Sequence, residues 1–291
     1  MIDARNRAPI AQQTFTQGAD RTPNVLALLA IAWVLGAGTV VVTRFRGEWE
    51  LYRALHRWAA AHGVPDVLRN FDSLILCVAA AFVGARIVAR SRGGKAGGWL
   101  RLRGGRPGWG IMVPLALVPM LVGGAALGWA RTNPGADFAA LLPKLVGGVI
   151  RAPIAEEMLF RGLLVAVCAA AIGWRGTRFW CNATMSAALF AATHVSWTAE
   201  AFADGWATLL VTGAGGLWYG WLLARWRSLW VPMILHAGMN LGWALAAAGG
   251  GAGGGGWIEN LLRVATIVIA TWWTVRRTRT EDRSEHVDTQ L

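Results

Sequence analysis

Long apolar stretches separated by short polar segments make up most of the chain. Each stretch is close to the roughly 20 residues that a helix needs to cross the hydrocarbon core of a bilayer. The pattern therefore predicts an all-α fold, a polytopic transmembrane helical bundle of about eight spans with a polar cavity between helices. The expected spans are residues 24–42, 71–89, 109–130, 150–173, 180–198, 206–224, 229–248 and 257–275.

The composition of the chain agrees with a membrane protein. Its 291 residues are 55% hydrophobic and only 15% charged, and the mean hydropathy is +0.42. Soluble domains carry about 25% charged residues, so an ordinary soluble protein is excluded. Arginine strongly outnumbers lysine, and together with the many alanines and glycines this hints at a GC-rich bacterial genome. Cys77, Cys168 and Cys181 lie in apolar segments without CxxC spacing and are expected to be reduced packing residues.

The positive charge is spread unevenly over the connecting segments. Lysine and arginine total 28 against 16 acidic residues, which gives a net charge of +12. If the N-terminus is inside, inner segments hold 18 basic residues and outer segments eight, and Arg161 and Arg263 remain within spans. This bias favours a multi-pass protein of the cell membrane with both termini cytoplasmic. The basic residues then contact the lipid bilayer, and no nucleic acid is expected as a partner.

Within residues 47–62, Leu51, Leu55 and Trp58 share one face of a helix, which favours a helix lying in the membrane interface.

The polar segments divide the chain into five parts. The parts are a cytoplasmic N-terminal segment (1–23), three spans with a basic loop and the interfacial helix (24–137), a central core (138–248), a Gly-rich linker with the last span (249–275) and a charged, disordered cytoplasmic tail (276–291).

Three ionisable residues interrupt the apolar pattern between residues 156 and 161. A charge at bilayer depth costs at least a few kcal/mol, so such residues are by default functional. Glu157 and Arg161 are i,i+4 neighbours on a helix and can neutralise each other. Glu156 points about 100° away and has no partner nearby in the sequence. One carboxylate is therefore free for chemistry.

Two further expected spans carry polar side chains on one face. Phe190 and His194 share a helical face in one span, and His236 and Asn240 do so in another. Each feature alone has a structural explanation: a hydrogen-bonded packing histidine, an interhelical amide, or a buried ion pair. Bringing Glu156, His194, His236 and Asn240 together around a wet cavity would satisfy all of these groups.

The three motifs together resemble a known family. Glu-Glu-xxx-Arg, Phe-xxx-His and His-xxx-Asn, in this order within residues 138–248, resemble the CAAX prenyl protease and bacteriocin-processing family of intramembrane endopeptidases. The resemblance implies that Glu156 is the general base and that His194 orients the attacking water. It implies that His236 and Asn240 donate hydrogen bonds to the oxyanion. The supporting residues are then Glu157, Arg161 and Phe190.

A metal-dependent alternative remains open at this stage. Glu156, His194 and His236 also form a set of two histidines and one carboxylate, as in catalytic zinc sites with an open position. Glu157 would then be the base. The preferred interpretation needs no cofactor, and zinc or another divalent metal is the alternative.

The function that the resemblance implies is hydrolysis of a peptide bond in a hydrophobic or membrane-anchored peptide or protein. One alternative is a non-enzymatic bacteriocin-immunity or scaffold protein that uses the same polar cluster to bind a partner. A transporter with a proton relay is a weaker third hypothesis. The complete motif set favours the enzyme.

The expected span boundaries place the two histidines at different depths. His194 lies 14 residues into its span and His236 only six or seven, which corresponds to a difference of roughly 10 Å at 1.5 Å per residue. Either the span of His236 begins deeper, after a re-entrant segment at Trp226–Trp230, or the span of His194 starts later. In addition, residues 138–149 could extend the helix that carries Glu156 and place that carboxylate deeper.

Overall fold

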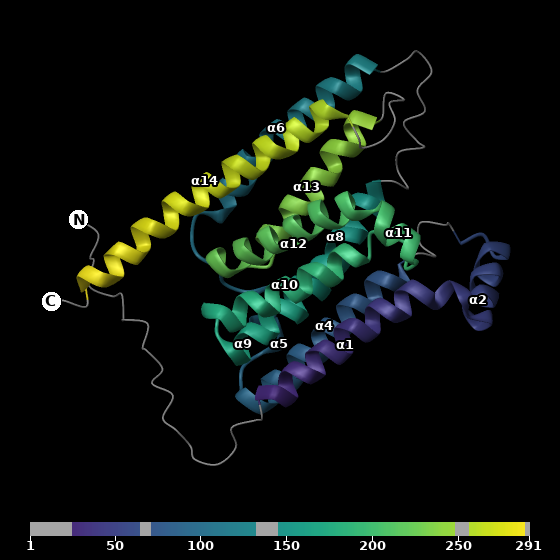
Figure 1. Cartoon of the computed structure of the whole chain (residues 1–291), viewed down its shortest axis with the longest axis horizontal. Helices are drawn as coiled ribbons and strands as arrows, with labels where there is room; N and C mark the ends of the chain where they lie inside the picture. The colour runs from purple at the N-terminus through teal and green to yellow at the C-terminus, as the bar shows by residue number, and fades with distance from the viewer. Residues whose placement is uncertain (1–24, 65–70, 132–144, 248–255, 289–291) are drawn as a thin grey trace, which may run out of the picture.

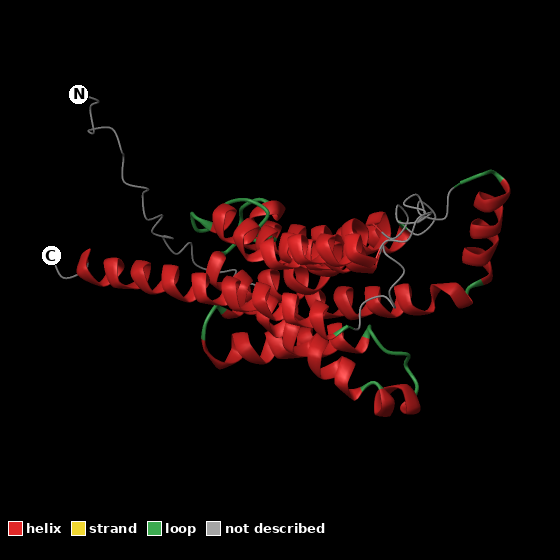
Figure 2. Cartoon of the chain, turned by 90° about the horizontal axis from the view of Figure 1, so that it is seen from above, coloured by secondary structure: helices red, strands yellow, loops and turns green. Residues whose placement is uncertain are grey.

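The computed structural model describes residues 25–64, 71–131, 145–247 and 256–288 (Figure 1). Within these ranges every regular element is a helix (Figure 2). The all-α expectation is therefore confirmed for the described part of the chain. The N-terminal segment 1–23 and most of the Gly-rich linker lie outside the described residues.

Five described helices are long and apolar enough to cross a membrane. Three other helical segments occupy the remaining expected spans, but they do not meet this criterion of length and composition. The segment around Glu156 contains charged residues, and the helix at Gly176–Ala192 is only 17 residues long. Eight spans therefore remain an expectation. The five helices are α1 (Val25–Phe45), α4 (Asp72–Arg92), α6 (Trp109–Arg131), α12 (Trp206–Trp226) and α14 (Trp257–Asp288).

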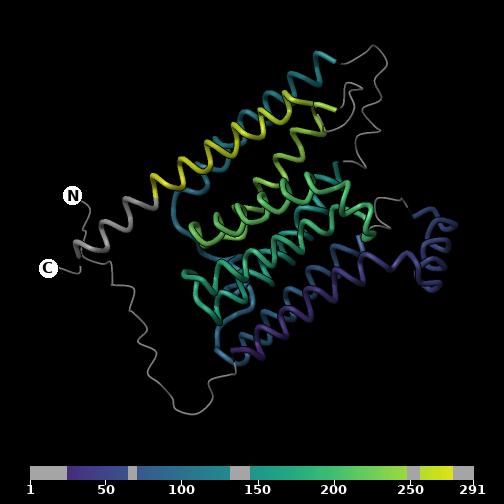
Figure 3. Tube along the Cα trace, in the orientation of Figure 1, coloured from purple at the N-terminus to yellow at the C-terminus, as the bar shows by residue number. Residues whose placement is uncertain are grey.

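The three other segments complete the bundle. The first is a continuous run of short elements, and the second and third are single helices. Their bounds are η3 (Leu145–Arg151), α8 (Ala152–Glu156), η4 (Glu157–Val167) and α9 (Cys168–Ile172) for the run, then α10 (Gly176–Ala192) and α13 (Trp230–Ala247). Successive long helices alternate in direction (Figure 3). The start of α1 and the end of α14 lie at the same end of the bundle (Figure 1).

The helices pack around two apolar cores. One core joins α1, α4, η4 and α10, and the other joins α6, α12, α13 and α14. Close approach in the second core depends on glycines. A Cβ atom at Gly124 or Gly128 would collide with the backbone of α13 at Gly242 and Leu245. Small residues allow helix backbones to approach in this way.

The helix that carries the glutamates is wider than an α-helix. Residues of η3 and η4 form π-helical turns, whose backbone hydrogen bonds span five residues and which are frequent at functional sites. Two buried side chains of α10 donate to carbonyl oxygens of η4: Ser186 Oγ to Phe160 at 3.0 Å and Asn182 Nδ2 to Leu164 at 2.6 Å. Because lipid cannot hydrogen-bond the backbone, these donors stabilise the irregular segment.

The structure bears on two predictions about shorter segments, the interfacial helix and the C-terminal tail. A helix, α2 (Glu50–Ala61), follows a short turn η1 (Arg46–Glu48), and its residues Leu51, Leu55 and Trp58 are exposed, as an interfacial helix requires. The tail from 276, expected to be disordered, continues α14 as a helix to Asp288, so that prediction is wrong.

The cysteines fall into two groups. Cys77 and Cys168 are buried free thiols, as expected for packing residues. Cys181 is exposed, so the packing interpretation is wrong for this residue. It lies near the start of α10 and faces away from the cores.

Candidate active site

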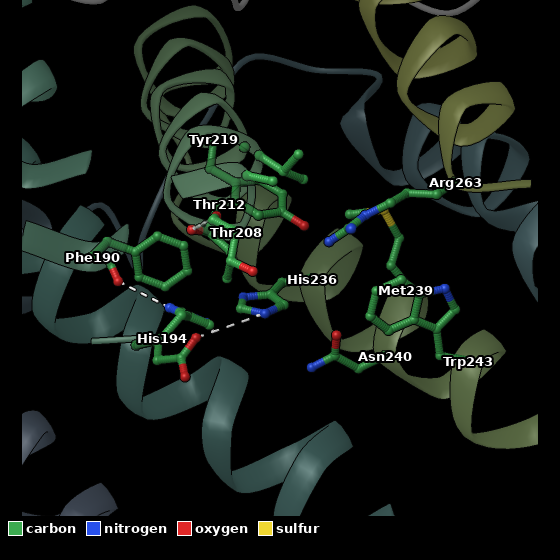
Figure 4. A pocket seen from close by; sticks show the side chains of 14 residues that line it. Phe190, His194, Thr208, Thr212, Tyr219, His236, Met239, Asn240, Trp243 and Arg263 are labelled. Carbon is green, nitrogen blue, oxygen red and sulfur yellow. Dashed lines mark hydrogen bonds and ion pairs between the residues drawn. The ribbon is translucent and has the colours of Figure 1, made fainter. Parts of the chain in front are cut away.

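The four residues expected to carry the chemistry line one cavity of about 490 Å³. Glu156 comes from the end of α8, His194 follows α10, and His236 and Asn240 come from α13. Figure 4 shows the side chains of His194, His236 and Asn240 directed into the same space. Two helices and the turn after a third thus supply polar groups to one volume inside the bundle.

Glu157 and Arg161 form a buried ion pair beneath this cavity. Arg161 Nη1 lies 3.2 Å from Glu157 Oε1, and both side chains are at most 1% exposed. The guanidinium carbon is 4.2 Å from the ring centre of Phe190 and 5.3 Å from that of Tyr219. Aromatic faces attract a desolvated cation. The i,i+4 pairing expected from the sequence is present, and aromatic rings surround its cation.

His236 connects the two glutamates. Its Nδ1 lies 2.9 Å from Glu157 Oε1, and its Nε2 lies 3.7 Å from Glu156 Oε2. Its ring stacks on Tyr219 with the centroids 5.5 Å apart. Since an ionised carboxylate only accepts hydrogen bonds, Nδ1 carries a hydrogen and donates it to Glu157. The orientation of the imidazole is therefore fixed, with Nε2 directed toward Glu156.

The two glutamates differ in their access to the cavity. The Glu157 side chain is completely buried and is engaged by Arg161 and His236. The Glu156 side chain is 27% exposed and lines the cavity. Only Glu156 is therefore positioned to meet a water molecule in the cavity.

His194 lies in a turn after α10 rather than inside a helix, because α10 ends at Ala192. The expected span 180–198 is therefore too long at its C-terminal end. One further turn, closed by a backbone bond from His194 N to Ala191 O at 2.9 Å, still places the His194 ring against Phe190. His194 Nδ1 donates to Phe190 O at 2.9 Å, since a carbonyl oxygen can only accept. In the neutral imidazole Nε2 is then an acceptor.

Asn240 links α13 to the segment that precedes Glu156. Its Nδ2 donates to the carbonyl oxygen of Gly148 at 2.8 Å. An amide nitrogen has two hydrogens, so one remains for a ligand. The side chain is therefore held in place and still has a donor to offer in the cavity.

The sequence predicted different depths for His194 and His236, and the segment just before α13 bears on this difference. Trp226, Ser228 and Leu229 are fully buried, although they connect two long helices. Residues 101–106 cover this connection: Leu229 N donates to Arg101 O at 3.0 Å, and Arg106 N donates to Trp226 O at 2.8 Å. Since α10 starts at Gly176, earlier than expected, the later start of the span of His194 is not observed, and the deeper start of α13 stays an expectation.

A second cavity reaches the same residues from the side of α1 and α4. Its volume is about 270 Å³, and Glu156 and His194 line it together with Val40, Thr43 and Cys77. These two side chains therefore stand between two separate spaces, one bounded by α12 and α13 and the other by α1 and α4.

Tyr219 and Arg263 are among the residues that line the main cavity and were not predicted as site residues. Tyr219 stacks on His236, and Arg263 lies 4.6 Å from the ring centre of Trp243 and points into the cavity (Figure 4). Arg263 could have been found from the sequence, because a lone arginine within an apolar segment is unfavourable in lipid. Tyr219 carries no comparable signal, since an aromatic residue in a span usually contributes to packing.

Comparison with known proteins identifies the central segment. Residues 138–242 match the family model described as type II CAAX prenyl endopeptidase Rce1-like. The family resemblance is confirmed. The match covers every motif residue, and the matched family is one of prenyl endopeptidases; the match supports neither a bacterial origin nor a metal requirement. No curated protein and no solved structure matches the chain.

Proposed function

We propose that this protein is an intramembrane endopeptidase that hydrolyses a peptide bond of a hydrophobic or membrane-anchored substrate, with Glu156 as the general base. The observation that carries the proposal is the contrast between the two glutamates. Glu156 lines the cavity that His194, His236 and Asn240 share, whereas Glu157 is sealed beneath it by Arg161 and His236. The Rce1-like match supports the reaction class.

In the proposed first step, a water molecule lies between Glu156 and His194. His194 Nε2 accepts a hydrogen bond from this water, because Nδ1 already donates to Phe190 O. Glu156 removes a proton as the water oxygen attacks the scissile carbonyl carbon. When the C–N bond breaks, the same carboxyl returns the proton to the leaving nitrogen. The products are a carboxylic acid and an amine.

His236 and Asn240 would stabilise the negative oxygen of the tetrahedral intermediate. His236 Nε2 donates only when it carries a hydrogen, so both ring nitrogens must be protonated in this step. The hydrogen bond from Nδ1 to Glu157 supports that charged form, as a carboxylate behind a histidine does in hydrolytic triads. Asn240 contributes the amide hydrogen that Gly148 O does not use.

The donor geometry does not favour the alternative in which a metal activates the water. Within the described ranges, no three His, Cys, Asp or Glu side chains lie close enough together to hold a metal ion. We therefore derive no step through a metal. Chelation of the purified protein remains the direct test, and zinc-restored activity after chelation would favour the metal alternative.

A non-enzymatic immunity or scaffold protein is the second hypothesis. Such a protein uses the polar cluster for packing or partner binding, and neither use needs the partly exposed Glu156 carboxylate to remove a proton. Glu156→Gln separates the two hypotheses, because it keeps the shape of the side chain and removes the base. A scaffold would tolerate this change, whereas a protease would not.

The experiment is cleavage of a hydrophobic peptide library by the purified full chain, with and without a chelator. We expect wild type to generate new peptide termini, and Glu156→Gln to fold but lose several orders of magnitude in rate. Glu200→Gln is a matched control on an exposed glutamate of α11 (Ala199–Asp204). Equal rates in wild type and Glu156→Gln would rule out the assigned base, and Glu157 would be tested next.

A further inference from the structure

A second charged cavity lies between the turns that connect α9 to α10 and α12 to α13. These turns lie at the end of the bundle where α1 starts and α14 ends (Figure 1). Its volume is about 300 Å³, and it is formed by the turn between α9 and α10, the turn between α12 and α13, and the segment after α5 (Ala96–Trp99). The residues that carry the argument are Arg106, Arg175, Arg225 and Arg227, with Trp174, Trp180 and Trp221 as aromatic walls.

The arginines around this cavity repel one another. The guanidinium carbons of Arg101 and Arg227 lie 5.0 Å and 4.2 Å from the ring centre of the same tryptophan, Trp174. Burial, followed by the charges of Arg101, Arg106 and Arg175, lowers the pKa of Arg227 to about 10. Arg227 Nη1 is buried and has no hydrogen-bond partner among the described residues. An anion in the cavity would reduce this repulsion and give Arg227 Nη1 an acceptor.

The segments that form the cavity supply no carboxylate. The sequence has no aspartate or glutamate between Asp72 and Asp137, and none between Glu157 and Glu200. The same holds between Asp204 and Glu259, which includes the turn after α12. This contrasts with the active-site cavity, where Glu157 neutralises Arg161.

The arginines are held in place by the backbone. Arg227 has a left-handed conformation with φ of 54°, which is uncommon for a residue with a side chain. The bonds from Arg106 N to Trp226 O and from Leu229 N to Arg101 O fix the two chain segments against each other. The cavity also includes Gly176, the first residue of α10, so unpaired backbone N–H groups at this helix start add positive potential.

We propose that this cavity binds a phosphate group, and that the phosphate belongs to the headgroup of an anionic phospholipid. Arginine forks recognise phosphate oxygens in pairs. Basic pockets between helices on the cytoplasmic side bind anionic headgroups, and tryptophans prefer the membrane interface. The distribution of basic residues favours a cytoplasmic location for this end of the bundle. The proposal is independent of the proposed protease activity.

Lipid binding is measured on the full chain purified in detergent and delipidated. Phosphatidylglycerol, phosphatidylcholine or inorganic phosphate is added, and retained ligand and unfolding temperature are recorded by native mass spectrometry and thermal denaturation. We expect phosphatidylglycerol to bind and to raise the unfolding temperature, whereas phosphatidylcholine does neither. Stabilisation by inorganic phosphate alone would keep the phosphate site and reject the lipid as its source.

Arg227→Gln is the decisive variant. Loss of one charged hydrogen-bond donor to phosphate is expected to weaken phosphatidylglycerol binding about 10- to 100-fold. Arg178→Gln is the matched control, because Arg178 is exposed in the first turn of α10 and does not line the cavity. If Arg227→Gln does not fold, Arg175→Gln replaces it. Wild-type binding in the folded variant, or equal binding of both lipids to wild type, would overturn the proposal.

Discussion

The two charged cavities of the bundle balance their charges differently. At the active-site cavity, Glu157 neutralises Arg161 and holds His236, so the buried cation has its counterion inside the protein. The second charged cavity is the arginine-lined cavity, with Arg106, Arg175, Arg225 and Arg227 in its wall. There, Arg227 is surrounded by other cations, and the segments that form the cavity contain no acidic residue. The first arrangement holds the proposed catalytic groups in position, whereas the second is proposed to bind an anion from outside. The same type of residue thus has a structural role in one region and a binding role in the other.

The largest effect on stability is expected for Arg161→Met. Removal of one member of a buried ion pair costs about 3–5 kcal/mol, because the remaining charge stays buried without its partner. Arg227→Gln should cost far less in delipidated protein, since it relieves repulsion among cations. Denaturant unfolding in detergent measures both free energies. Equal losses would remove the contrast between the cavities, and Glu157→Gln/Arg161→Met should recover part of the loss.

Asn240→Ala should reduce kcat about 10²- to 10³-fold if the amide donates to the oxyanion. The reason is that the remaining amide hydrogen of Asn240 faces the cavity, while the other is bound to Gly148 O. Asn260→Ala is the control, because Asn260 is exposed and donates to Gly256 O, just before the start of α14. A change in KM with an unchanged kcat would instead assign Asn240 to substrate binding.

Asn182→Ala should destabilise the bundle by about 1–3 kcal/mol, the cost of leaving buried hydrogen-bonding groups unpaired. Asn182 donates to Leu164 O and accepts from Trp33 Nε1 at 3.0 Å, so two groups lose their partner. Thr39→Ala removes only a bond to Leu35 O within the same helix and serves as the control. A loss no larger than that of Thr39→Ala would show that η4 does not need these side-chain donors.

Cysteine labelling tests which side of the membrane each connecting segment faces, and no change in stability is expected. Single cysteines are introduced by Ser91→Cys, Gly253→Cys and Thr280→Cys in a chain without its native cysteines. A membrane-impermeant reagent added from outside should label only position 253, because basic residues concentrate in the segments expected to be cytoplasmic. Labelling at position 91 from outside would place the arginine-lined cavity outside as well.

Most of the helices could be predicted from the sequence, and so could the presence of Glu156, His194, His236 and Asn240 around one cavity. Helix positions follow from apolar length, and the Glu157–Arg161 pair follows from i,i+4 spacing. The end of α10 before His194 was missed, because residues 193–198 contain no glycine or proline that would mark the turn. The hydrogen bond from His236 to Glu157 joins residues 79 positions apart, and periodicity within one helix carries no information about such a contact.

The π-helical turns and the buried turn before α13 were also beyond sequence reasoning. A π turn depends on donors such as Asn182 and Ser186 from a neighbouring helix, so it is a property of packing. The segment Trp226–Trp230 was only one of two explanations for the depth of His236. Its burial depends on the cover of residues 101–106, which lie more than 100 positions earlier in the chain.

The most direct test of the account is peptide hydrolysis in water enriched in ¹⁸O, with wild type and Glu156→Gln compared at equal concentration. Wild type is predicted to cleave a hydrophobic peptide and to place one ¹⁸O atom in the new carboxyl group, because the attacking oxygen comes from water. Glu156→Gln is predicted to bind the same peptide and yield no labelled product above background. Labelled product from Glu156→Gln at the wild-type rate would contradict the assignment of Glu156 as the base.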